Sequence, residues 1–386
     1  MLHNQPYSIQ SHSMLFSSIP GHSLLKERLA DMANAGRTPH SLLFWGDWGV
    51  GALPLALALA QLMVCKAKEN GDACGKCPPC NKMQKLIHPD LHFAIPVNSV
   101  KPSDRNPVTD LYISKWRETL IANPFLSEFD WYEALGIDNK SGNISVHEAD
   151  AIQKKLSLKP YEGEVKFMIV WLPEKMNIQA SNTILKILEE PPLGTHFFLV
   201  SEHPELLLST IRSRCQAIRV NPISQEELAP ALSKDLYISH QEALTLARHA
   251  NGSYGKARAV SNRSEQQEEL IKYASDLMTL CVDKKLLSLI EWADDVAGLG
   301  REQQRQMVAY TLDLLREVHV EHLHARHISN ALASDLPHLG AWASNRPPHF
   351  FSQAVEALNG ALSDIDRNVN AKMTFYSTAL RLFFAS

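Results

Sequence analysis

The hydrophobic pattern of the chain changes a little past its middle. In the first 220 residues, short and mostly apolar runs, typical of buried parallel strands, alternate with segments of helical spacing. These runs occupy residues 41–45, 165–172, 196–201 and 216–220. Because a sheet buried on both faces needs helices on both sides, we predict an α/β domain with a parallel sheet.

The strand pattern stops after residue 224. Three short helices are predicted at residues 225–232, 239–249 and 255–263, and the remaining residues to 386 have helical spacing almost throughout. A small three-helix domain followed by an all-α domain is the simplest account of this pattern. We therefore place domains at residues 1–221, 222–263 and 264–386.

A glycine-rich turn follows the first predicted strand and precedes a helix that is apolar all round. Gly46 and Gly51 have the spacing of a phosphate loop, in which backbone N–H groups surround the phosphates, a lysine reaches them and a hydroxyl holds Mg²⁺. Ala52 and Leu53 stand at the lysine and hydroxyl positions. By itself such a turn is more typical of ordinary tight-turn chemistry.

The run at residues 165–172 lacks the acidic residues that would complete a nucleotide site. A nucleotide hydrolase ends this strand with paired acids, one for Mg²⁺ and one to orient water. Trp171 and Leu172 occupy those places, and the first carboxylate is that of Glu174. We therefore expect no functional ATP or Mg²⁺ site.

Four of the six cysteines lie close together in the sequence, at Cys65, Cys74, Cys77 and Cys80. Residues 1–18 carry no charged region followed by an apolar run, so no secretion signal is expected and the cluster favours metal over disulfides. Four thiolates can close a tetrahedral zinc site with no open position. We predict structural zinc, with four reduced thiols as the alternative.

The composition excludes several classes of protein. The apolar fraction of 45% and charged fraction of 21% are those of a soluble globular protein. No segment approaches 18 uninterrupted apolar residues, so we expect no membrane partner and a cytoplasmic location. A net charge of −4 offers no overall attraction for nucleic acid.

The pattern loosens in residues 98–143, which we interpret as an insertion. This insertion is rich in aromatic residues: Trp116, Phe125, Phe129, Trp131 and Tyr132. We expect these side chains to pack back on the core, and a partner surface is the less favoured alternative.

Several motifs resemble the AAA+ clamp-loader subunits of bacterial DNA polymerase III. They are Ile19-Pro20-Gly21-His22, residues 37–44, the four-cysteine module, residues 182–192, Ser213-Arg214-Cys215 and residues 366–372. The resemblance spans the chain apart from the insertion. It implies an AAA+ (RecA-like) domain with a zinc module, a lid domain and an oligomerisation collar at the three predicted domains.

Motor subunits of that family keep the phosphate loop and paired acids, whereas one non-motor subunit has lost both and keeps the Ser-Arg-Cys arginine. Gly255 also stands where motor subunits carry their second sensor arginine. The resemblance therefore implies a subunit that is no ATPase by itself. It implies motor (gamma/tau-type) and delta subunits as partners in a hetero-oligomeric ring that loads the sliding clamp onto primer-template DNA.

The resemblance also implies a role for Arg214. A planar, permanently charged guanidinium presented to ATP on the adjacent motor subunit can stabilise charge on the γ-phosphate, as an arginine finger. Ser213 and Cys215 would hold the turn. From the tripeptide alone, a salt-bridged helix end is the simpler interpretation.

Two other functions stay open. An active AAA+ motor would need its lysine and acids from unusual positions, and the next lysine downstream is Lys66, beyond the loop helix. A zinc-knuckle nucleic-acid-binding module would need basic and aromatic residues around the cysteines. Five lysines are present (Lys66, Lys68, Lys76, Lys82, Lys85), but no aromatic residue lies between Cys65 and Leu91.

Overall fold

A five-stranded parallel sheet, with strand order β2-β3-β4-β1-β5, forms the centre of the first half of the chain. The strands are β1 (Ser41–Trp45), β2 (Leu91–Ala94), β3 (Lys166–Trp171), β4 (Thr195–Ser201) and β5 (Gln216–Arg219). The predicted parallel sheet is confirmed. Only β2 was not expected, because it is short and carries the polar His92 among its apolar residues.

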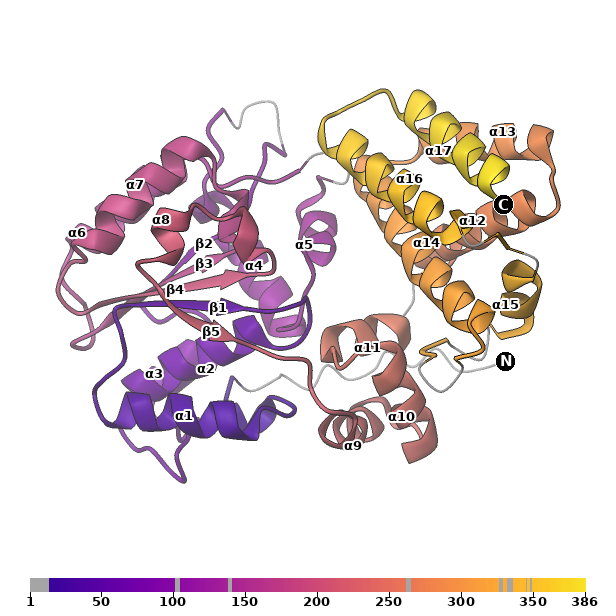
Figure 1. Cartoon of the computed structure of the whole chain (residues 1–386). Coiled ribbons are helices and arrows are strands. Elements are labelled where there is room, and N and C mark those ends of the chain that lie inside the picture. Colours follow the sequence, from indigo (N-terminus) through magenta and orange to yellow (C-terminus); the bar gives the residue numbers. More distant parts are fainter. Residues whose placement is uncertain are drawn as a thin grey trace. The chain divides into compact units, whose positions relative to one another are not determined.

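The computed structural model describes residues 14–100, 105–137, 141–261, 265–325, 329–331, 336–344, 346–347 and 349–386 (Figure 1). Residues 1–13, which form most of the segment in which no secretion signal is expected, lie outside this set, as do residues 101–104 and 138–140 of the insertion. The chain divides into two compact units. The first comprises the described residues up to Ala247 together with Gly252–Arg258, and the second comprises Arg248–Asn251 and the described residues from Ala259 to Ser386.

Helices cover both faces of the sheet in the first unit (Figure 1). Those around the sheet are α1 (Ser23–Asn34), α2 (Ala52–Val64), α3 (Pro78–Gln84), α4 (Thr109–Ala122), α5 (Glu128–Leu135), α6 (Val146–Ser157), α7 (Ile178–Glu189) and α8 (Ser209–Arg212). The all-apolar α2 is buried along nearly its whole length. On the opposite face α6 and α7 pack on the strand residues Leu43, Met168 and Phe197. Successive side chains of each strand point to opposite faces of the sheet, so they contribute to two separate core layers.

Three short helices follow the last strand: α9 (Gln225–Leu236), α10 (His240–His249) and α11 (Tyr254–Ser261). They confirm the three predicted helices, although α9 extends past the predicted end. The compact units group most of these helices with the sheet, so the boundaries at 221 and 263 stay predictions.

The second unit is helical throughout the part that the structure describes. Its helices are α12 (Glu265–Val282), α13 (Leu286–Gly298), α14 (Arg301–His322), α15 (Leu336–Ala343), α16 (His349–Asp366) and α17 (Ala371–Ala385). They share one core that includes Trp292, Val308 and Phe375. Among the described helices, none is long and apolar enough to cross a membrane.

The insertion forms α4 and α5, and its aromatic residues pack inward as predicted. Trp116, Trp131 and Tyr132 are buried, whereas Phe129 is only half-buried. The Trp116 ring lies 5.2 Å from that of Trp131 and 5.0 Å from that of Trp171 on β3, measured between ring centroids. The insertion is therefore attached to the sheet at β3, the strand that ends in Trp171 where a nucleotide hydrolase carries an acid.

Candidate functional site

The glycine-rich turn joins the end of β1 to the start of α2, where a phosphate loop would lie. Gly49 and Gly51 have φ angles of 78° and 109°, in the left-handed region that glycine adopts most readily. Helix α2 begins at Ala52 with Gly51 as its N-cap. Local backbone geometry therefore accounts for these glycines without a ligand.

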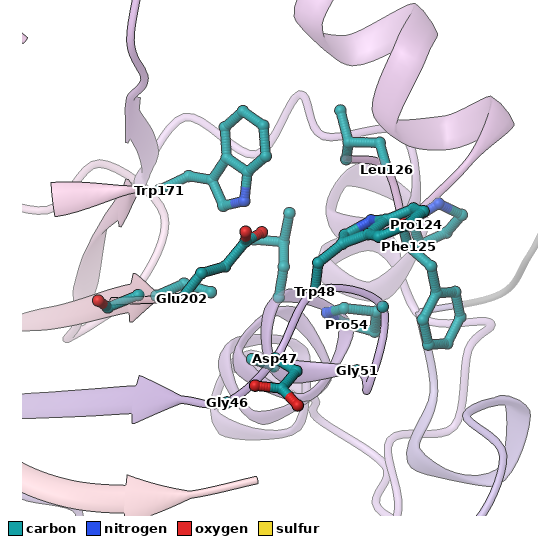
Figure 2. A pocket seen from close by; sticks show the side chains of 15 residues that line it. Gly46, Asp47, Trp48, Gly51, Pro54, Pro124, Phe125, Leu126, Trp171 and Glu202 are labelled. Carbon is teal, nitrogen blue, oxygen red and sulfur yellow. Dashed lines mark hydrogen bonds between the residues drawn. The ribbon is translucent and has the colours of Figure 1, made fainter. Parts of the chain in front are cut away.

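The pocket beside this turn is small, and Figure 2 shows the side chains that line it. Its volume is about 30 Å³. This is room for one or two water molecules and far less than a nucleotide needs. Its walls comprise the loop, Ala52, Leu53, Pro54, Pro124, Phe125, Leu126, Trp171, Val200, Ser201 and Glu202. Of these lining residues only Asp47 and Glu202 are ionisable, and both are acidic. The lining thus offers no cationic side chain to a phosphate.

Helix α11 and the residues before it bind directly to the loop. The Ser253 hydroxyl donates a hydrogen bond to the carbonyl oxygen of Trp48, at 2.8 Å, and the Gly255 N–H donates to the carbonyl oxygen of Gly49, at 3.0 Å. A Cβ atom on Gly255 would lie 2.7 Å from the Cα atom of Gly49. The two backbones are therefore too close for any side chain, and residue 255 must be glycine in this arrangement.

Glu202, at the end of β4, is the ionisable group with the most altered environment in this pocket. Burial, with the nearby Glu174 and Glu128 carboxylates adding to it, raises the pKa of Glu202 to about 8. Glu174 is positioned by accepting hydrogen bonds from the N–H groups of Glu202 and His203, at 2.9 and 3.0 Å. Glu202 was not among the residues predicted from the sequence, although its place directly after a buried strand was a usable signal.

The four clustered cysteines come together in space. Their sulfur atoms all lie within 4.8 Å of one another, close to the separation of about 3.8 Å that four ligands have around one zinc ion. Backbone N–H groups of Lys76 and Cys77 point at the Cys74 sulfur, at 3.5 and 3.4 Å, and lower the pKa of its thiol to about 6. This arrangement fits a metal that binds thiolates.

Arg214 lies on the short connection between α8 and β5. Its guanidinium donates a hydrogen bond to the carbonyl oxygen of Thr210, at 3.0 Å, and forms an ion pair with Glu189 at the end of α7. The Ser213 hydroxyl also donates a hydrogen bond to the carbonyl oxygen of Thr210, at 3.0 Å. Burial raises the pKa of the Cys215 thiol to about 11, which keeps it unreactive at neutral pH.

Comparison with known proteins assigns the chain to a family. A family model described as DNA polymerase III, delta subunit, matches residues 21–224, more than half of the chain. DNA polymerase III subunit delta' of Escherichia coli K12 is 27% identical over 344 residues, which are 88% of this chain and 85% of that protein. The chain belongs to the delta' family of DNA polymerase III subunits.

Other similarities are weaker or shorter. The delta' subunit of Bacillus subtilis 168 is 28% identical over 236 residues, which cover 61% of this chain and 58% of that relative. A solved gamma-subunit-related protein of Thermotoga maritima aligns with 92% of this chain and 99% of its own length, at 17% identity and a TM-score of 0.37. A TM-score this low adds nothing to the fold, which rests on the sheet itself.

In this delta' family member, the two segments that the sequence analysis compared with a nucleotide site line one pocket. Gly46, Gly51, Ala52 and Leu53 line the same pocket as Trp171, although more than 100 residues separate them along the chain. The sequence did not predict that Phe125 of the insertion would complete the wall. No local signal marks that contact, because it depends on how α4 and α5 pack.

Proposed function

We propose that the chain is a non-hydrolysing delta' subunit of the clamp-loader complex of DNA polymerase III. It would join motor (gamma/tau-type) and delta subunits in a cytoplasmic ring that loads the sliding clamp onto primer-template DNA, with the helices from α12 onward as its collar and α9 to α11 as its lid. The observation that carries the proposal is the small pocket lined by Ala52, Leu53 and Trp171, which has no cationic side chain in its lining, in a chain of the delta' family. This pocket argues against the alternative of an active motor.

We further propose that Arg214 acts as an arginine finger on ATP held by the neighbouring motor subunit. Its side chain is 35% exposed, so a neighbour can reach it. An ion pair this exposed contributes at most about 1 kcal/mol, so exchanging Glu189 for a more highly charged phosphate group costs little. The Glu189 pair is compatible with a resting position of the finger.

A reconstituted complex with motor and delta subunits tests both proposals. Arg214→Ala should assemble normally yet lose hydrolysis at the site it serves, because an arginine finger contributes about 10³ to 10⁵ in rate. Glu189→Ala removes the same ion pair but keeps the arginine, so its ATPase activity should stay normal. Equal losses in the two variants would mean that only the ion pair matters. Failure of the unmodified chain to enter the complex would refute the proposed function.

The cysteine cluster supports a structural zinc ion as the only cofactor we propose. Cys65, Cys74, Cys77 and Cys80 would be its four ligands, which leaves no open position for catalysis. The metal would hold the segment between α2 and α3 in place. Because the site is absent from the unfolded chain, metal binding would add to the stability of the first unit.

A further inference from the structure

The connection between α4 and α5 enters the pocket beside the glycine-rich loop (Figure 2). Phe125, in this connection, is only 5% exposed. The indole N–H of Trp48, on the loop, donates a hydrogen bond to the carbonyl oxygen of Phe125, at 3.0 Å. The Phe125 ring also lies 4.6 Å from the ring of Tyr254, the first residue of α11, measured between ring centroids. Phe125 therefore contacts the loop and α11 at once.

The insertion holds this connection in place from both sides. Before it, Trp116 of α4 packs between Trp131 and Trp171. After it, α5 begins with a reciprocal cap, in which Ser127 and Asp130 each accept a hydrogen bond from the other's backbone N–H, and the Trp131 indole donates to the carbonyl oxygen of Pro96, at 2.8 Å. A connection fixed at both ends presents Phe125 in one position.

We propose that the α4–α5 connection is a built-in plug of the vestigial nucleotide pocket, and that it locks the loop to α11 without any ligand. Phe125 fills space next to Gly51, and its ring packs against the ring of Tyr254. Trp48 forms hydrogen bonds with both Phe125 and Ser253. An added segment thus occupies part of the pocket, which also lacks the lysine of a phosphate loop. This role for the insertion does not depend on the proposed role of Arg214.

Hydrogen exchange on the full chain, read by mass spectrometry, tests the plug. Phe125→Ala should speed exchange at least tenfold in residues 46–52 and 252–258, with strands β3 and β4 unchanged. Leu111→Ala is the control, because Leu111 lies on the same insertion but is 60% exposed, and it should change nothing. Unchanged exchange in Phe125→Ala, or equal acceleration across the whole first unit, would overturn the proposal, since Phe125 would then be an ordinary core residue.

A milder variant covers the case in which Phe125→Ala does not fold. Trp48→Phe keeps an aromatic ring but removes the N–H that binds Phe125, so exchange in the same two segments should rise about fivefold. No rise there would overturn the proposal. Mg²⁺ and ATP added to the unmodified chain should leave both segments unchanged, whereas protection of residues 46–52 would show that the pocket is open. Assembly and the Arg214 variants decide the proposed function separately.

Discussion

Substitution of Gly255 by alanine tests the close approach of α11 to the loop. A Cβ atom at this position would lie 2.7 Å from the Cα atom of Gly49 and 2.9 Å from the carbonyl oxygen of Phe125. Both neighbours are backbone atoms, so neither can turn aside as a flexible side chain would. The hydrogen bond from the Gly255 N–H to Gly49 would be stretched or lost as the helix shifts.

The expected magnitude combines three effects. Overfilling a packed site costs about 1–3 kcal/mol, and weakening one hydrogen bond costs about 0.5–1.5 kcal/mol. Alanine recovers about 1 kcal/mol through its better helix propensity. We therefore expect Gly255→Ala to lower the free energy of unfolding by about 1–3 kcal/mol.

Gly360→Ala is the matched control, because Gly360 lies within α16 and has no atom within 4 Å of a Cβ built on it. It should raise stability by about 0.5–1 kcal/mol. Since the chain has two compact units, urea unfolding should be combined with hydrogen exchange, which reports each unit separately. If Gly255→Ala were as stable as the unmodified chain, or gained stability as the control does, the loop and α11 could not be held in contact.

Three further predictions concern other parts of the first unit. Cys80→Ser, at the most buried of the four cysteines, should abolish bound zinc measured by elemental analysis, and a chelator should lower the melting temperature of the unmodified chain but not of this variant. Glu202 keeps its proton in the folded state between about pH 4.5 and 8 but loses it in the unfolded chain, so the unmodified protein should lose stability as pH rises through this window. Glu202→Gln should remove that loss in urea unfolding at pH 5 and pH 8.5, and parallel pH profiles would contradict the raised pKa. Trp116→Ala should destabilise the chain by about 3–5 kcal/mol in urea unfolding, because it leaves a cavity between Trp131 and Trp171, and a cost below about 1 kcal/mol would contradict that packing.

Several features could be predicted from the sequence because they depend on local patterns. Four of the five strands follow from short, mostly apolar runs, and the helices follow from apolar spacing. The cysteine cluster follows from short spacings that keep the ligands near each other in any compact fold. That no lysine follows Gly51 can be read directly from the sequence, without the structure.

Tertiary structure alone decided which distant residues meet. Residues 48, 125 and 254 lie far apart along the chain, and their contact depends on how the insertion and α11 dock on the sheet. The pairing of Arg214 with Glu189 and the raised pKa of Glu202 arise in the same way. A local sequence pattern indicates that a segment is buried, but it does not indicate which other segment packs against it. Side-chain contacts and burial across the fold set these partners, and with them the small size of the pocket.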